Sequence, residues 1–310
     1  MSAAAIASAL HERLGLAITD VELIAGGDIN DAYRAITSGN RPIFVKSSPR
    51  ALPGMFTDEA AGLQWLGAAP DGVATPKVIG IVDPPERRTA VPRLLALEWI
   101  DRGSLDDAGE ERLGRGLAAI HAAGAPAFGA TPLLDDDGLL RSDAHCHSAM
   151  RFNELALPND ACDSWAEFYA QRRIIPLVLA CLEKGRLDAD DAEVFGRCAA
   201  RTEQLAGPAE PPARTHGDLW AGNVIAGADG EPYLIDPVAH GGHREVDLAL
   251  LRVFGGPSER CFAAYDELYP LADGWRERIE LWQLAMILLH VWLFGGRYRE
   301  QALAVARRYG

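Results

Sequence analysis

One stretch in the C-terminal half constrains the fold more than any other, residues 215–238, which read THGDLWAGNVIAGADGEPYLIDPV. It places Asp218 at the mouth of a short loop, Asn223 a few residues later, and Asp236 at the end of an apolar run. The runs VIA and PYLI are short β-type segments, and the GADG between them is a turn sequence. The pattern predicts two carboxylates and one carboxamide at loop–strand junctions, where rigid elements can aim them.

This set of polar side chains suits phosphoryl transfer. One carboxylate, Asp218, can orient an attacking hydroxyl and take its proton, while Asn223 and Asp236 supply oxygens that hold Mg²⁺ against the phosphates of ATP. Kinase catalytic loops of the H-R-D-x-x-x-x-N type have the same spacing, with Gly217 in place of the arginine here. A lone HGD is more often a surface turn, but the ordered series of HGD, Asn and a strand ending in Asp favours catalysis.

Composition narrows the possible partners. The 310 residues suffice for one large or two modest domains. A formal net charge of −14 argues against binding to nucleic acid or to an anionic membrane surface, and is compatible with a cationic substrate. Five cysteines without a CxxC pair, no signal-peptide pattern and no long apolar run predict a cytoplasmic protein without disulfides. We expect a monomer or a homodimer.

The first hundred residues alternate short β-type runs with few helices. After a helix capped by Ser2, one helix at about 57–66 interrupts the runs. The runs follow one another closely, which predicts an antiparallel five-stranded sheet. They cover residues 21–27, 32–37, 42–48, 77–82 and 93–100.

Two features of this part point to a nucleotide. Gly26 and Gly27 lie between the first two runs, where glycines let a backbone loop approach phosphate closely, although an ordinary hairpin turn fits equally well. Lys46 ends the strand IFVK, and Glu59 lies in the first turn of the next helix. Kinases hold the α- and β-phosphates with such a pair, whereas the alternatives are a solvated edge lysine and a glutamate that favours the helix dipole.

The last β-type run ends in Glu98, Trp99 and Ile100, just before the polar segment around Gly103. The backbone groups of Glu98 and Ile100 can meet an adenine base, although a simple linker explains the segment equally well. We expect an ATP-binding lobe over residues 1–101 and a catalytic, substrate-binding helical lobe over residues 102–310.

The second part is mostly helical. His121 lies on the apolar face of the first of these helices and is expected to be a packed structural histidine; Asp247 either steadies the catalytic loop or complements a helix dipole. Residues 125–160 are interpreted as a long loop, residues 240–243 as a glycine-rich loop, and Pro176 as the site of a kink. Helices are expected at 107–124, 165–185, 188–207, 258–268, 275–294 and 297–308, and a further helix within 240–256 is expected to begin near Glu245.

The whole chain resembles a known family through motifs that occur in order along it. These are GGDINDAYR, FVK, the glutamate of DEAAGLQWL, LALEWID, LAAIH, WAEFYAQRRI, THGDLWAGNV, YLIDPVAHGGHREVDLAL and LFGGRY. On these residues the chain is similar to the fructosamine kinase (ketosamine 3-kinase) family. That family belongs to the protein-kinase-like group, with aminoglycoside phosphotransferases and choline kinases.

The resemblance implies an α+β, bilobal protein-kinase-like fold, with ATP and Mg²⁺ as cofactors. It implies phosphorylation of the 3-hydroxyl of ketosamines, such as fructosamine or ribulosamine adducts on small molecules or on protein lysines, in deglycation repair. By position, Asp218 is the catalytic base and Trp220, within HGDLW, lines the sugar site unless it only packs under the loop. His216 of the same motif is a second candidate for substrate contact.

Residues 147–160 lack the asparagine- and glycine-containing segment that is usual in this family, so the substrate-side wall can differ. Two alternatives stay open. The same fold can act on another cationic acceptor, such as an aminoglycoside, a choline-like amine or another sugar, or it can bind ATP without catalysis. An intact set of Lys46, Asp218, Asn223 and Asp236 argues against the second.

Overall fold

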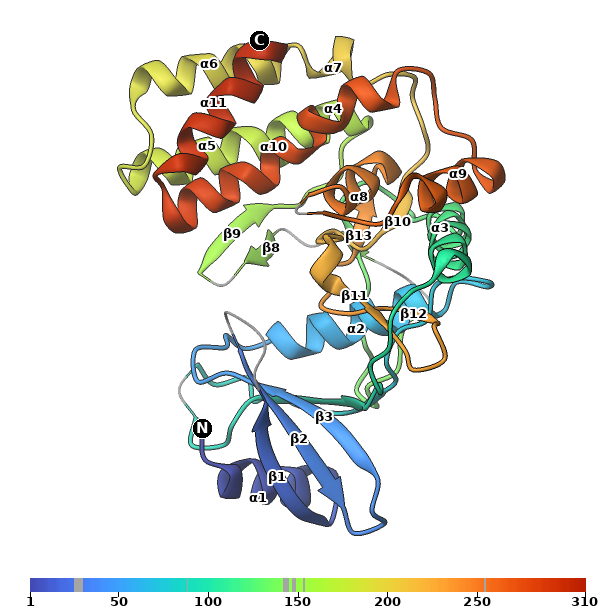
Figure 1. The fold of residues 1–310 in the computed structure, drawn as a ribbon. Helices are drawn as coiled ribbons and strands as arrows, with labels where there is room; N and C mark the ends of the chain where they lie inside the picture. Colours follow the sequence, from blue (N-terminus) through green and yellow to red (C-terminus); the bar gives the residue numbers. More distant parts are fainter. Residues whose placement is uncertain (25–29, 88, 142–144, 147–148, 153, 254) are drawn as a thin grey trace.

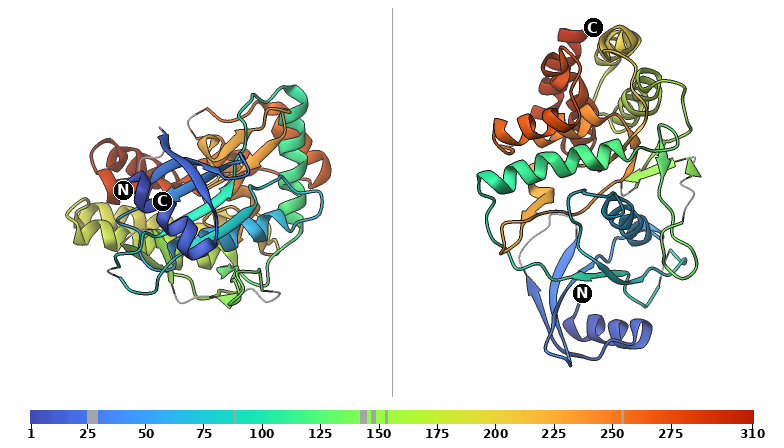
Figure 2. Two further views of the ribbon diagram at one scale, coloured as in Figure 1. Left: turned by 90° about the horizontal axis from the view of Figure 1, so that it is seen from below. Right: turned by 90° about the vertical axis from the view of Figure 1, so that its right-hand side faces the viewer.

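The computed structural model describes the chain except residues 25–29, 88, 142–144, 147–148, 153 and 254. An antiparallel sheet with its flanking helices forms one end of the molecule, and a mostly helical part forms the other. The N-terminus lies at the sheet end and the C-terminus at the helical end (Figures 1 and 2). The predicted α+β, kinase-like architecture is confirmed.

The five expected strands form one sheet in the order β1-β2-β3-β5-β4, with every neighbouring pair antiparallel. Consecutive strands therefore pair, except where β5 inserts between β3 and β4. The strands are β1 (Ile18–Ile24), β2 (Asp31–Thr37), β3 (Pro42–Ser47), β4 (Val78–Val82) and β5 (Leu94–Glu98).

The alternation of side chains along a strand divides this sheet into two apolar faces. Helix α1 (Ala3–Leu14), capped by Ser2, packs on the face that contains Val45 and Ala96. Helix α2 (Met55–Gly67) packs on the opposite face against Leu95 and Leu97. Both faces are covered, which explains why β5 reads as a continuous apolar run. The same alternation turns Lys46 of β3 toward α2.

Helices dominate the rest of the chain (Figures 1 and 2). One core packs α10 and α11 against α5 and α6, and a second joins α3, α8 and α9 to the end of α2. The helices are α3 (Asp107–Ala122), α4 (Trp165–Phe168), α5 (Ile175–Glu183), α6 (Ala189–Ala200), α7 (Thr202–Leu205), α8 (Arg244–Leu251), α9 (Glu259–Leu268), α10 (Trp275–Phe294) and α11 (Arg297–Tyr309).

The helix predicted over residues 165–185 contains a π-helical segment, Tyr169–Ile174, between α4 and α5, just before the position where a kink was predicted. Pro176 lies in the first turn of α5. Proline cannot donate a backbone hydrogen bond and its ring crowds the preceding turn. The wider π turn lets the helix continue past this position.

Two loop predictions are wrong. Residues 125–160 contain four short strands that pair as β6 (Ala130–Thr131) with β7 (His145–Cys146) and β8 (Ala149–Phe152) with β9 (Leu155–Pro158). Residues 240–242 form β13 (His240–Gly242), which pairs with β10 (Ala213–Thr215). These strands have only two to four residues each, which is too few to show the alternation of apolar and polar side chains that predicts a strand. A Cβ at Gly241 would overlap the carbonyl oxygen of Ala127, so this glycine permits close packing of chain and not a flexible loop.

The cysteines Cys162, Cys181, Cys198 and Cys261 are free thiols, and the two on α5 and α6 are buried, as expected. Within the described ranges, no helix is both long and apolar enough to cross a membrane.

Candidate active site

The stretch that dominates the sequence forms a compact turn between two small sheets. Strand β10 leads into residues 216–220, a 3-10 turn follows at η2 (Ala221–Asn223), and the hairpin of β11 (Val224–Ala226) and β12 (Pro232–Leu234) ends just before Asp236. A single bridge between Ala74 and Tyr233 ties this hairpin to the segment after α2. The predicted loop–strand junctions are therefore present.

Asp218 and Asn223 are hydrogen-bonded to each other within this turn. The side-chain Nδ2 of Asn223 donates to the backbone oxygen of Asp218 at 2.8 Å and to its Oδ2 at 3.1 Å. Burial raises the pKa of the Asp218 carboxyl to about 7, helped by the nearby charges of Asp236 and Asp247, although the Asn223 hydrogen bond and Lys46 act against it. A carboxyl with a pKa near neutrality can exchange a proton with a hydroxyl group.

Lys46, Glu59 and Asp236 converge from three separate elements. The Lys46 Nζ lies 3.0 and 2.9 Å from the two carboxylate oxygens of Glu59 on α2, and 3.0 Å from Oδ1 of Asp236. Burial by itself lowers the pKa of Lys46, but the two carboxylates outweigh it and raise that pKa. Lys46 is therefore positively charged and held in one position, where β3 approaches the segment that contains Asp236.

Asp236 has an unusual backbone. Its φ of 55° lies in the left-handed region, where residues other than glycine are uncommon. Its side chain keeps 43% of its surface exposed although it contacts the buried Lys46. Strained conformations of this kind concentrate at functional sites, because the surrounding structure must hold them in place.

A fully buried carboxylate, Asp247, binds the backbone of residues 216 and 217, just before Asp218. Asp247 of α8 accepts hydrogen bonds from the backbone N–H of His216 at 2.6 Å and of Gly217 at 3.0 Å. Its Oδ2 also contacts Nε2 of His121 at 3.2 Å, and Nδ1 of the same ring contacts the Tyr265 hydroxyl at 2.8 Å. Burial alone would raise the pKa of Asp247, but these partners hold it below its ordinary value.

Asp247 therefore steadies the turn that contains Asp218, and it also lies in the first turn of α8, so both roles that the sequence allows are compatible with the structure. His121 is a packed, buried histidine, as predicted. Tyr265, which completes the network from α9, has no signal in the sequence.

Gly217 is required by this geometry. Its φ is +82°, and a Cβ there would overlap the carbonyl oxygen of Val238 and lie 2.9 Å from the ring of His240. The arginine of other kinase loops cannot occupy this position in this backbone.

His216 does not lie where a substrate can reach it. Its ring is buried, with Nε2 2.9 Å from the carbonyl oxygen of Ile235 and Nδ1 accepting from the Asp218 backbone N–H at 3.2 Å. The geometry supports a positioning role over the predicted substrate contact. Trp220, by contrast, is 39% exposed, and its ring packs over Gly222, where a Cβ would overlap it. A substrate role for Trp220 stays a prediction.

The predicted adenine contacts lie at the end of β5. The backbone N–H of Glu98 donates to the Lys77 carbonyl oxygen at 2.9 Å, and Glu98 lies opposite Ile43 of β3. Ile100 follows the strand. Gly26 and Gly27 lie outside the described residues, and the contact of these four positions with a nucleotide remains a prediction.

The residues present fit a magnesium ion that is bound together with phosphates. Asn223 uses Nδ2 within the turn, which leaves its amide oxygen, and Asp236 offers a partly exposed carboxylate. In the described part of the chain, no three His, Cys, Asp or Glu side chains are arranged to hold a metal by themselves. Mg²⁺ commonly takes only one or two protein carboxylates and completes its shell with phosphate and water.

Comparison with known proteins agrees with this geometry. A family model described as fructosamine kinase matches residues 2–309. The chain belongs to the fructosamine kinase family. A "probable ketoamine kinase" of Synechocystis sp. is 33% identical over 90% of this chain and 86% of that protein.

Two solved structures place the fold within a wider group. A protein of Thermobifida fusca provisionally named a fructosamine-3-kinase is 38% identical, with a TM-score of 0.83 over 97% of each chain. The choline kinase LicA of Streptococcus pneumoniae shares the fold, with a TM-score of 0.61 at 17% identity over 98% of each chain. Family membership makes this protein a small-molecule kinase, that is, a phosphotransferase.

Proposed function

We propose that this kinase phosphorylates the 3-hydroxyl of ketosamines, the adducts of a ketose sugar with an amine, and thereby supports deglycation. The observation that carries the proposal is the contact of Lys46 with Glu59 and Asp236, close to the hydrogen-bonded pair of Asp218 and Asn223. The chain also matches the fructosamine kinase family from end to end. The proposed division places residues 1–101 around ATP and residues 102–310 around the acceptor, in a cytoplasmic protein.

Each residue has a separate part in the proposed reaction. Lys46, held by Glu59, offsets negative charge on the phosphates of ATP. Asn223 and Asp236 would hold Mg²⁺, which would supply positive charge beside the phosphates. Asp218 aligns the acceptor hydroxyl with the γ-phosphorus and takes its proton as the new O–P bond forms and ADP leaves. Positioning and electrostatics supply most of the rate.

We expect Trp220 to contact the acceptor. Its exposed ring follows Asp218 by two residues, so it can cover one face of a sugar whose hydroxyl reaches the Asp218 carboxylate. His216 acts from beneath the turn, where it fixes the backbone of Asp218 through its Nδ1. A phosphate on carbon 3 is a better leaving group than the hydroxyl that it replaces. In the proposed release, the ketosamine loses a proton from carbon 1 to form an enaminol, and the enaminol expels the phosphate from carbon 3. Water then hydrolyses the resulting imine at carbon 1, which gives the free amine and a deoxygenated dicarbonyl sugar.

A panel of acceptors tests the proposal. ADP release is measured with a fructosyl-amine and a ribulosyl-amine, and with the same amines without sugar. An aminoglycoside, choline and a free ketose represent the other acceptor classes that the net charge of −14 allows. We expect turnover with at least one ketosamine and none with its unglycated amine. Turnover with only aminoglycoside, choline or free sugar would replace the proposal with that acceptor class.

A further inference from the structure

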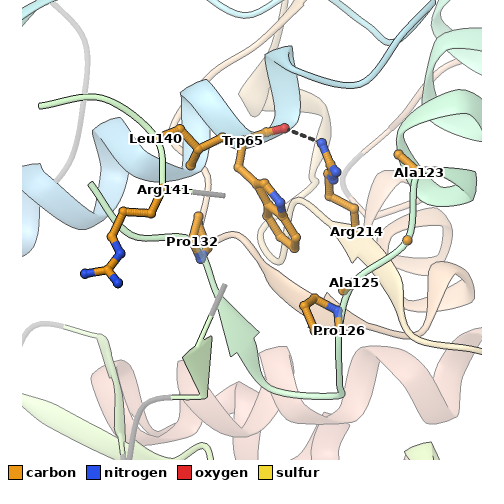
Figure 3. A pocket seen from close by; sticks show the side chains of 9 residues that line it. Trp65, Ala123, Ala125, Pro126, Pro132, Leu140, Arg141 and Arg214 are labelled. Atoms are coloured by element: carbon orange, nitrogen blue, oxygen red, sulfur yellow. Dashed lines mark hydrogen bonds between the residues drawn. The ribbon is translucent and has the colours of Figure 1, made fainter. Parts of the chain in front are cut away.

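A cavity of about 370 Å³ lies outside the site described above, at the junction of α2, the end of α3 and β10. Its wall includes Trp65, Pro126, Pro132, Leu140 and Arg214, and Figure 3 shows Arg214 reaching up to the Trp65 backbone. Small-molecule sites commonly have volumes of about 300–1,000 Å³. The size therefore suits a small organic ligand.

The guanidinium of Arg214 is poorly satisfied. Nη1 donates to the carbonyl oxygen of Trp65 at 2.7 Å, the single hydrogen bond that this group makes with the described residues. Its Nε is buried without a partner, and the group lies 4.8 Å from the centre of the Trp65 ring. Arginine is chosen at binding sites because its planar fork donates to carboxylate or phosphate in pairs. The inaccessible Nε cannot meet a ligand, but Nη2 and the second N–H of Nη1 can donate together.

The charge is also unbalanced. Of the described residues that line the cavity, none is an Asp or a Glu, and Arg214 forms no ion pair with a described carboxylate. Burial lowers the pKa of Arg214, and no acidic side chain among the described residues counteracts it. In a chain with a net charge of −14, a half-buried cation that has no acidic partner among the described residues favours an anion from outside the chain.

We propose that this cavity binds a small oxyanion, a carboxylate or phosphate carried on a flat apolar body. The anionic group meets the guanidinium of Arg214, while the flat body lies against the Trp65 ring and the two prolines. This ligand site goes beyond the proposed function and is separate from the acceptor.

The cavity joins two elements of the catalytic machinery. Trp65 lies on α2, the helix whose Glu59 holds Lys46. Arg214 lies on β10, directly before the turn that contains Asp218. A ligand bound to both ties α2 to β10, and so couples its own binding to the alignment of the active site.

Thermal unfolding with two probe anions tests the proposal. Benzoate and phenyl phosphate represent the carboxylate and phosphate sources, and benzamide is the neutral control. For the wild type we expect a saturable rise in the unfolding midpoint on the order of 3 °C with at least one anion at about ten times its dissociation constant. Benzamide should give no rise. Whichever anion gives the larger rise identifies the chemical class of the ligand.

Two arginine variants locate the effect. Arg214→Gln should weaken binding about tenfold or more, while Arg197→Gln, the same change at an exposed position on α6, should bind like the wild type. Anions that bind elsewhere, including at the nucleotide site, would stabilise Arg214→Gln as much as the wild type. That outcome, or no rise with either anion in the wild type, overturns the proposal.

A second measurement does not depend on the folding of Arg214→Gln. The indole N–H resonance of Trp65, assigned through Trp65→Phe, should shift when the wild type is titrated with the effective anion. An unshifted Trp65 resonance in a titration that raises the unfolding midpoint would place the anion at another site and contradict the proposal.

Discussion

Two groups of buried ions in this protein differ in how completely they are balanced. Lys46 contacts two carboxylates, Glu59 and Asp236, and one of the two stays partly exposed. Arg278, on α10, donates to both oxygens of Glu245 on α8, at 2.6 and 2.8 Å, and this carboxylate is 2% exposed. The group around Lys46 therefore has one more carboxylate than cations. The pair of Arg278 and Glu245 has one of each, and it is buried, so it needs no further partner. We call this pair the closed group and the Lys46 group the open group.

The difference separates function from stability. In the Lys46 group, one carboxylate is not neutralised, and that carboxylate belongs to Asp236, whose backbone is strained. We expect Mg²⁺ and the phosphates of ATP to balance this charge when they bind, so these residues should matter most for binding and catalysis. A closed pair should matter only for folding, because losing one partner leaves a buried charge unpaired. The carboxylates around the catalytic turn can therefore be sorted by substitution.

The largest effect is expected at Asp218. Asp218→Asn should lower kcat by about 100–10,000-fold, because the amide cannot take the hydroxyl proton. Its unfolding midpoint should be unchanged or higher, since burial already disfavours the charged carboxyl, whose pKa is raised to about 7. ADP release and thermal unfolding measure the two quantities, and substantial turnover by this variant would refute the assignment of the base.

Glu245→Gln tests the closed group. It removes the charge that Arg278 faces and weakens the bond from the Trp282 indole, 2.8 Å from Oε2. We expect a loss of about 3–5 kcal/mol in the free energy of unfolding, measured by denaturant titration. The folded fraction should keep the kcat of the wild type. A large fall in kcat with unchanged stability would erase the distinction between the two groups.

Asp236→Ala tests the open group. It removes a proposed magnesium ligand and one partner of Lys46, so the affinity for Mg·ATP should fall about tenfold or more. Calorimetric titration measures this affinity, with Asp229→Ala, in the turn between β11 and β12, as a matched control. The role of Asp236 fails if both variants bind Mg·ATP as the wild type does.

The smallest effect concerns pH. Burial and the charge of Arg173 lower the pKa of His240 to about 4, whereas an unfolded histidine titrates near pH 6.5. Between these values the unfolded chain binds a proton that the folded chain does not, so stability falls as pH drops from about 6.5 toward 4. His240→Gln should reduce this slope by up to about 1.4 kcal/mol per pH unit.

Chemical unfolding at pH 7 and pH 5 gives that slope. His216 and His243 are also buried and have lowered pKa values, so part of the slope should remain in the variant. An identical slope in both proteins would show that His240 is not held neutral.

The sequence predicts side-chain positions best where a residue with a recognisable chemical role also lies in a regular strand or helix pattern. The strand IFVK and the following helix predicted the pair of Lys46 and Glu59, and the strand ending in PYLI predicted the position of Asp236. The structure brings all three together. Lys46 lies within β3 and Glu59 within α2, so the period of each element fixes the direction of its side chain. Glu59 lies just beyond the first turn of its helix, and not within that turn as predicted, because α2 begins at Met55.

The anchoring side of the turn was harder to predict. Tyr265 on α9 contacts His121 on α3, and these two helices are far apart in the chain. No sequence pattern around either residue indicates that they contact each other. The burial of His216 depends on the same tertiary packing, which a motif cannot show. The strands within 125–160 are too short to have a recognisable period, and they form only by pairing with each other and with the surrounding core.

The most direct test of the central claim is the identity of the product. Fructosyl- or ribulosyl-amine is incubated with ATP, Mg²⁺ and the wild type, and the product is followed by phosphorus and carbon nuclear magnetic resonance. We predict a phosphate ester at the 3-hydroxyl, followed by release of the free amine, and neither with Asp218→Asn. A phosphate at another hydroxyl, or a stable adduct after complete phosphorylation, would contradict the proposed ketosamine 3-kinase activity.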